Sequence, residues 1–357
     1  MPEFTLVEQP ASIAADLGKH DYVGVDTEFM REKTFFAELC LVQVATGETI
    51  YCVDPLSDHS MDEFWPALMR DTWVVHSGRQ DIEVVYQTSG KIPGRLFDTQ
   101  IAAGLLGHAP QMGYATLIKE LFDVEIEKTH TRANWSKRPL LDAFLEYAAE
   151  DVEHLLPAYE ALAEQLDKKG RLGWAEEDSA LLLNPALYDV DPKLAVDRMK
   201  GARNLRGKRR AVAARLAAWR ETEALRANRP RQWIAKDSAL LEVAACMPVS
   251  IEALGKIDGM PAGLIRRSGE RILAALSASG GDDNNYRPPA APDEEQKAIL
   301  KSVQKQVAEC AADLGLAAET VASKRDLSAV IMGGDRTSKV LSGWRRALVG
   351  DQLLELL

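Results

Sequence analysis

Short apolar runs, some alternating with polar residues and some continuous, fill the first part of the chain and predict β-strands. Three such runs, at 22–29, 37–46 and 48–55, are joined by short connections, which indicates an antiparallel meander. The elements expected after the meander are a helix at 61–70, a strand at 73–77 and a helix at 80–90. This succession predicts a mixed α/β sheet covered by helices.

The remainder of the chain has the pattern of helices. Apolar residues recur every three or four positions over 140–169, which predicts one long helix. After Gly173 the strand signals stop, and the stretch 277–295 is rich in Gly, Asn and Pro, as is typical of a linker. Further helices are expected at 209–230, 236–248 and 296–314.

These changes in pattern predict several domains, as the length of 357 residues also does. The expected parts are an α/β domain at 1–172, a basic connector at 173–208, a small helical domain at 209–279, a linker at 280–295 and a second small helical domain at 296–357. The two helical parts are of similar size, and a Lys-containing segment follows the first helix of each. We therefore expect a divergent internal repeat.

The charge of the chain is unevenly distributed. The net charge is −11, from 43 basic and 54 acidic residues, which taken alone argues against a nucleic-acid partner. The segment 198–236 holds 13 basic and 2 acidic residues, so it carries 13 − 2 = +11. Two interpretations remain open: this segment binds the body of an RNA, or it is a helix that pairs with acidic surface elsewhere in the chain.

Several classes of protein are disfavoured by the remaining composition. The four cysteines form no C-x-x-C pair and the six histidines do not cluster with them, so neither a disulfide scaffold nor a zinc site is expected. No signal peptide and no apolar stretch approaching 18 residues is found, which predicts a cytoplasmic protein without a membrane span. No GxxxxGK[ST] loop occurs, so no nucleotide cofactor is expected.

The candidate chemistry lies in three acidic segments. Asp26 and Glu28 are two residues apart on one predicted strand, so their side chains share a face. Asp81 opens the helix after the strand at 73–77, and Tyr147 precedes Asp151 by one helical turn. Each segment also has an ordinary interpretation: a solvent-facing strand edge, a helix N-terminal acid, and a core tyrosine beside a surface acid. It is their combination and order that favour a metal site.

Asp-x-Glu on a first strand, Asp after a later strand and Tyr-x-x-x-Asp on a late helix resemble the DEDD exonuclease superfamily. The tyrosine subtype is indicated, because the position that would hold the histidine of the other subtype is Glu146. The segments DTEFMREKTFFAELCLVQVA, HSGRQDIEVVY, LFDTQIAAGLLG, KTHTRANWSKRPL and LEYAAEDVEHLLPAYEAL are similar to the ribonuclease D family over roughly residues 20–235. The segment that begins RRAVAARLAAWRETEAL, at 209, resembles the HRDC module, and the family carries two such modules. The resemblance implies an RNase H-like mixed-sheet exonuclease domain followed by one or two small all-α HRDC domains.

The resemblance also implies an activity. The expected reaction is 3′→5′ hydrolysis of RNA to nucleoside 5′-monophosphates, with tRNA precursors and other small structured RNAs as substrates and a monomeric enzyme. Asp26, Glu28, Asp81 and Asp151 would hold two divalent cations, Mg²⁺ or Mn²⁺, with Asp26 bridging them. Tyr147 would orient the attacking water, because a phenol with a pKa near 10 is a poor base at neutral pH.

Candidate RNA-binding residues flank these acids. Basic residues interleaved with an aromatic suit a single strand, which predicts contacts with RNA from the loop at 128–140. The candidates are Gln80, Lys128, Arg132, Trp135 and Arg138. The alternative is that Trp135 anchors the core and the charges are solvated. For His76, at the end of a strand, a structural role is expected.

Two rival functions remain at this stage. A DNA exonuclease would use the same acids, because nothing among them distinguishes the 2′-hydroxyl of RNA. A catalytically inactive RNA-binding scaffold would keep the fold, although all five catalytic positions are occupied by the expected residues.

Overall fold

A computed structural model of the chain describes residues 2–126, 133–278 and 292–357. It divides into two compact units. The sheet unit comprises Met1–Met30, Glu38–Tyr188 and Pro292–Leu357, and the helical unit comprises Arg31–Ala37 and Asp189–Ala291. Within the described ranges, no helix is long and apolar enough to cross a membrane.

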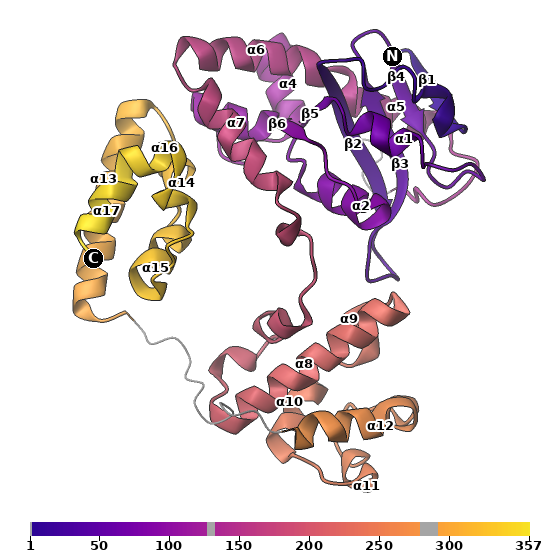
Figure 1. The fold of residues 1–357 in the computed structure, drawn as a ribbon, viewed down its shortest axis with the longest axis vertical. Helices are drawn as coiled ribbons and strands as arrows, with labels where there is room; N and C mark the ends of the chain where they lie inside the picture. The colour runs from indigo at the N-terminus through magenta and orange to yellow at the C-terminus, as the bar shows by residue number, and fades with distance from the viewer. Residues whose placement is uncertain (1, 127–132, 279–291) are drawn as a thin grey trace. The chain divides into compact units, whose positions relative to one another are not determined.

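A six-stranded mixed sheet organises the sheet unit (Figure 1). Its strands are β1 (Phe4–Val7), β2 (Tyr22–Met30), β3 (Glu38–Ala45), β4 (Ile50–Val53), β5 (Thr72–Val75) and β6 (Arg95–Asp98). The order is β1-β4-β3-β2-β5-β6, and β3 pairs antiparallel with β2 and β4 while the other pairs are parallel. The predicted meander is thus confirmed, whereas the two edge strands β1 and β6 were not foreseen.

The packing of the central strands β3 and β2 places Asp26 and Glu28 towards the C-terminal end of β2. All but the first residue of β3 are buried, because β3 is covered on both faces and reads as a nearly continuous apolar run. On β2, Gly24, Asp26 and Glu28 share one face. A methyl group on Gly24 would lie 3.1 Å from Leu155, so helix α6 (Leu155–Lys168) covers this face at the start of β2. The two acids follow towards the end of the strand. The register of β2 on β3 shifts between Glu28 and Phe29.

In the described part of the sheet unit, α-helices precede Tyr188 along the chain. They are α1 (Phe64–Leu68), α2 (Arg79–Ser89), α3 (Thr99–Leu106), α4 (Tyr114–Phe122), α5 (Asp142–Glu153), α6 (Leu155–Lys168) and α7 (Leu172–Ala180). The single helix predicted at 140–169 is wrong, because the chain breaks at His154, where φ is −103° and ψ is 6°. Pro157 lacks the N–H that would bond to the carbonyl of Glu153, so a continuous helix is interrupted there.

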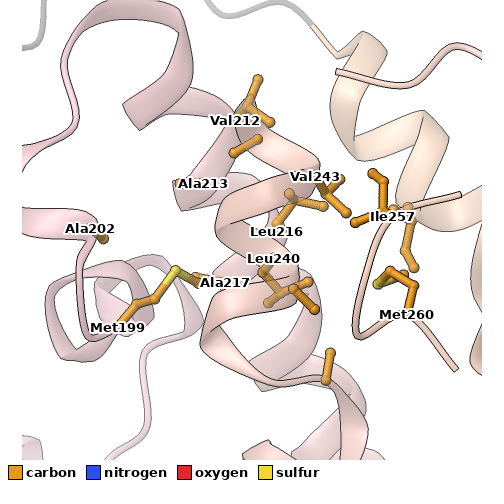
Figure 2. Close-up of a cluster of buried hydrophobic side chains, with 14 of the residues drawn as sticks. Met199, Ala202, Val212, Ala213, Leu216, Ala217, Leu240, Val243, Ile257 and Met260 are labelled. Atoms are coloured by element: carbon orange, nitrogen blue, oxygen red, sulfur yellow. The ribbon is translucent and has the colours of Figure 1, made fainter. Parts of the chain in front are cut away.

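The helical unit is built on α8 (Gly207–Ala227), with α9 (Arg231–Ile234), α10 (Asp237–Cys246), α11 (Ile251–Leu254) and α12 (Ala262–Ser277). Leu216 on α8, Leu240 and Val243 on α10, and Ile257 share one buried core (Figure 2). Part of the positive charge of this unit is internal. Its buried or partly buried ion pairs include those of Arg198 and Arg231 with Glu221, Arg210 with Asp197, Arg220 with Asp237, and Arg226 and Arg271 with Glu223.

The C-terminal helices repeat the same order of elements. They are α13 (Glu294–Leu314), α14 (Ala318–Val321), α15 (Lys324–Gly333), α16 (Gly343–Arg345) and α17 (Asp351–Glu355). The lengths of α8, α9 and α10 are 21, 4 and 10 residues, and those of α13, α14 and α15 are also 21, 4 and 10. These equal lengths agree with the expected internal repeat.

Helix α7 belongs to the sheet unit, although the connector was expected to begin at 173. It packs against β6, and its residue Trp174 stacks on Trp344 of α16 with ring centroids 4.5 Å apart. Asp178 of α7 accepts hydrogen bonds from the guanidinium of Arg345, one of them at 2.7 Å. The C-terminal helices are therefore anchored on α7 within this unit.

Candidate functional site

Three carboxylates from two distant segments meet at the end of β2. Oxygen atoms of Asp26, Glu28 and Asp151 all lie within 4.8 Å of one another. Asp26 and Glu28 share a face because they are two residues apart on a strand, and α5 brings Asp151 to that face. Oxygen ligands at this spacing, from half-buried side chains, form a donor set that suits a hard divalent cation.

The fourth predicted acid, Asp81, is held beside this group from the other side of β2. It lies in the first turn of α2 and is only 8% exposed. The hydroxyl of Thr27, which points to the opposite face from its neighbours Asp26 and Glu28, donates to Asp81 Oδ1 over 2.5 Å. The strand that carries Asp26 and Glu28 thus also orients the fourth acid, Asp81.

The electrostatics of the four acids favour a bound cation. Burial, followed by the charges of Asp81, Asp151 and Glu28, raises the pKa of Asp26 well above its usual value. Burial and neighbouring carboxylates raise the pKa of Glu28 to about 8, and burial raises that of Asp81 to about 6. The charges that raise the pKa of Asp26 most are those of the three other acids. Such a cluster is costly as anions unless positive charge is supplied, so the residues present fit divalent metal ions.

Tyr147 faces the same acids from one helical turn before Asp151. Its hydroxyl donates a hydrogen bond to the Asp151 carboxylate. Burial, then the charges of Asp151, Glu28 and Asp26, raises the pKa of Tyr147 above its usual value of 10. The phenol therefore remains protonated at neutral pH and is available as a hydrogen-bond donor or acceptor beside the carboxylates.

The predicted RNA-binding residues differ in their exposure and in their contacts. Lys128 and Arg132 lie outside the described residues. Gln80 is exposed at the start of α2, next to Asp81. Trp135 is 3% exposed and packs in the core, with its ring centroid 5.4 Å from that of Phe144, so the alternative of a core anchor is the one that the geometry supports.

Arg138 is committed to contacts within the protein. Its guanidinium donates to both carboxylate oxygens of Asp54 over 2.6 Å, and to the carbonyls of Cys40 and Trp135 over 2.7 Å. A phosphate would have to displace this buried carboxylate. Arg138 therefore has a structural role that ties the loop before α5 to the sheet, and its contact with RNA stays a prediction.

Sequence reasoning missed two groups that hold these elements in place. The carboxylate of Asp98 accepts the backbone N–H groups of Ser77 and Gly78 in the turn that leads to Asp81, each over 3.0 Å. The hydroxyl of Tyr114 accepts the N–H of His154 over 3.1 Å at the end of α5, just beyond Asp151. A signal for Asp98 was present, because an Asp-Thr pair after an apolar strand is a typical helix start.

His76 has the structural role that was expected. Its Nε2 donates to the carbonyl of Met112 over 2.9 Å, and its Nδ1 lies 2.9 Å from the hydroxyl of Thr99. Both ring nitrogens are thus engaged within the protein. Burial lowers the pKa of His76, which favours the neutral ring.

Comparisons with known proteins agree with this geometry. Residues 3–167 match the 3′-5′ exonuclease family model, and residues 209–276 match the HRDC domain model. The chain is 36% identical to ribonuclease D of Gluconacetobacter diazotrophicus, over 99% of this chain and 91% of that protein. It is 34% identical to ribonuclease D of Pseudomonas paraeruginosa, over 100% of this chain and 98% of that protein. The crystal structure of Escherichia coli RNase D, described as an exoribonuclease involved in structured RNA processing, superposes with a TM-score of 0.90 at 27% identity, covering 99% of this chain and 98% of that one.

Proposed function

The chain belongs to the ribonuclease D family of 3′-5′ exoribonucleases, and we propose that it releases nucleoside 5′-monophosphates from RNA 3′ ends with the help of two divalent cations. The observation that carries the proposal is the convergence of Asp26, Glu28 and Asp151 within 4.8 Å. Three carboxylates are a suitable ligand set for one ion. Asp81, on the other side of Asp26, would complete the set for a second ion, with Asp26 shared between the two.

Each protein group then has a defined task. Bound Mg²⁺ or Mn²⁺ supplies positive charge for the phosphate and favours deprotonation of water at neutral pH. The four acids hold that charge in place, and Thr27 keeps Asp81 turned towards it. Tyr147, whose phenol stays protonated, orients the attacking water through a hydrogen bond. The buried ring of Trp135 packs 6.3 Å from that of Tyr147 and supports its orientation.

We further propose that the helical unit holds the body of the RNA. Phosphate contacts require exposed cations, and the segment at 198–236 retains many of them beyond its internal ion pairs. The exposed members are Lys200, Arg203, Arg206, Lys208, Arg209, Arg229 and Lys236. Such a surface suits 3′-extended tRNA precursors and other small structured RNAs, where a folded body accompanies the single-stranded end. Gln80 and the loop residues Lys128 and Arg132 remain candidates for contacts with that end.

The domain boundaries are also part of the proposal. The exonuclease domain would span 1–172. The connector would span 173–208, and its first part forms α7 in the sheet unit. The HRDC domain would span 209–279. The segment 280–295 would join it to a second, divergent HRDC domain at 296–357, which the equal helix lengths support. We propose that the enzyme acts as a monomer in the cytoplasm.

A single assay tests the catalytic proposal. The protein is incubated with a 3′-extended tRNA transcript and Mg²⁺, with and without a chelator, and the products are separated by chromatography. We expect 5′-monophosphates with Mg²⁺ and none with the chelator. The Asp151→Asn variant should lose several orders of magnitude in rate, while Asp142→Asn, at the exposed start of the same helix, should not. Near-normal activity of Asp151→Asn would overturn the assignment, and a parallel DNA oligonucleotide tests the rival substrate.

A further inference from the structure

The position of Asp81 depends on the turn that precedes it, between β5 and α2. The N-cap residue of α2 is Gly78, which has no side chain to cap the helix. The N–H groups of the turn itself are bound by Asp98, at the end of β6. Its Oδ1 accepts the N–H of Ser77 and its Oδ2 accepts the N–H of Gly78, each over 3.0 Å. The turn is thus held by a carboxylate about twenty residues further along the chain.

This turn is tight and its backbone is strained. Ser77 has a φ of 60°, in the left-handed region that a serine adopts at a cost in free energy. A methyl group on Gly78 would lie 2.4 Å from a methyl carbon of Val75, so the chain folds closely back on its own strand. The two hydrogen bonds from the turn to Asp98 offset this strain.

Asp98 is itself firmly anchored. It is 2% exposed, and its Oδ1 also accepts the N–H of Gln100 over 2.9 Å, which caps helix α3. Its own N–H donates to the hydroxyl of Ser179 on α7 over 3.0 Å. Its oxygens accept four backbone N–H groups, those of Ser77, Gly78, Gln100 and Ile101, so the carboxylate is a support for the turn rather than a metal ligand.

We propose that Asp98 is a positioning residue for the reaction: by fixing the turn at Ser77 and Gly78, it places the Asp81 carboxylate where it can complete the cation site. This inference rests on the proposed role of Asp81. Asp98 would affect metal binding and the chemical step without contacting RNA. Substitution should therefore change the metal requirement and leave the apparent affinity for RNA unchanged.

The main test is Asp98→Asn in the full chain. An amide offers one oxygen and one NH₂, so one of the two turn N–H groups would face a donor. We expect the affinity for Mn²⁺, measured by calorimetry, and the rate at limiting Mg²⁺ each to fall by about 10–100-fold, the range seen when groups that orient metal ligands are removed. Higher Mg²⁺ should restore part of the rate, and KM for RNA should stay the same.

Asp71→Asn is the matched control. Asp71 is also 2% exposed and also accepts a backbone N–H, that of Gly18 over 2.8 Å, but it precedes β5 at the opposite end of the strand from the turn. A general loss of stability should appear in both variants, whereas only Asp98→Asn should weaken Mn²⁺ binding. Equal Mn²⁺ affinity in wild type and Asp98→Asn, or an equal loss in Asp71→Asn, would overturn the proposal.

Two further variants keep the test decisive. Asp98→Ser preserves a cap for α3, because serine is a good N-cap, yet it is too short to hold the turn, so it should fold and still show the metal defect. Adding Ser77→Gly should rescue part of the Mn²⁺ affinity, because glycine adopts the left-handed conformation without strain. Asp81→Asn distinguishes failure of the proposed cation site from failure of the positioning role of Asp98. If Asp81→Asn remains active, the proposed cation site is wrong. If Asp81→Asn is inactive while both Asp98 variants behave as wild type, only the positioning role is wrong.

Discussion

The Thr27 hydroxyl donates to the Asp81 carboxylate across 2.5 Å and thereby links the strand that carries Asp26 and Glu28 to the helix that carries the fourth acid. We predict that Thr27→Val lowers kcat by about 10–100-fold, because the carboxylate loses the group that orients it. Thr27→Ser keeps the hydroxyl and should retain most of the activity. Single-turnover rates at saturating RNA would measure the effect, and a valine variant as fast as wild type would exclude an orienting role.

The metal-free protein should become less stable as the pH rises. Glu28 has its pKa raised from 4.5 to about 8, and Asp81 from 3.8 to about 6. Between these limits the folded state binds more protons than the unfolded state, so the free energy of unfolding falls as pH increases from about 4 to about 8. Melting temperatures in a chelator should decline over this range more steeply for wild type than for Glu28→Gln.

Divalent cations should reverse that trend. Added Mg²⁺ binds the ionised acids of the folded state, so it should raise the melting temperature of wild type most at the upper end of the pH range. Glu28→Gln should start from a higher melting temperature without metal and gain less from its addition. Parallel pH profiles of the two metal-free proteins would contradict the raised pKa of Glu28.

Arg138 should matter for stability more than for RNA binding. Arg138→Met leaves Asp54, which is 5% exposed, without its bidentate partner. Removing one member of such a buried pair costs about 3–5 kcal/mol, which denaturant unfolding would detect. Lys137→Met, in the same loop but exposed, is the control and should unfold like wild type. A raised KM with unchanged stability would restore the RNA-binding interpretation.

The sequence was sufficient to predict the acidic residues but not the residues that hold them in position. The alternation of β2 and the helical spacing of Tyr147 and Asp151 are local periodicities, so they could be read directly. The support from Asp98 could not, because it joins the end of one strand to a turn after another, and no period in the sequence relates them. For the same reason the short edge strands β1 and β6 were missed: their pairing partners are distant in sequence.

The surroundings of two RNA-binding candidates could not be predicted either, because single positions do not reveal burial. Trp135 and Arg138 have the composition of a nucleic-acid contact, and only the fold shows that one ring is in the core and one guanidinium faces Asp54. The break at His154 was different, because Pro157 was visible in the sequence. A proline in the first turn of a helix is common, so Pro157 indicated that a helix begins near this position. The continuous apolar periodicity over 140–169 led to the prediction of one helix instead.

Exposed cations of α8 should determine the salt dependence of RNA binding. Replacing Lys208 and Arg209 together with Gln should reduce the slope of log K against log salt by about 1–2, since each phosphate contact contributes just under one unit. Replacing Lys168 and Lys169, two adjacent exposed lysines at the C-terminal end of α6, is the matched control. Equal slopes for both double variants would favour the alternative in which the basic segment serves only internal ion pairs.

The anchoring of the C-terminal helices should depend on one of two adjacent arginines. Arg345 is 4% exposed and pairs with Asp178, while Arg346 is exposed and pairs with Asp351 over 2.8 Å. We predict that Arg345→Met raises amide hydrogen exchange throughout α13 to α17, because it leaves Asp178 with its charge buried and uncompensated. Arg346→Met should leave exchange unchanged, because a solvent-exposed pair contributes little.

Degradation of a short unstructured RNA should be nearly the same in both variants, since neither residue contacts the acids at the end of β2. Equal exchange in the two variants would show that the stacking of Trp174 on Trp344 is sufficient to anchor the C-terminal helices without the ion pair.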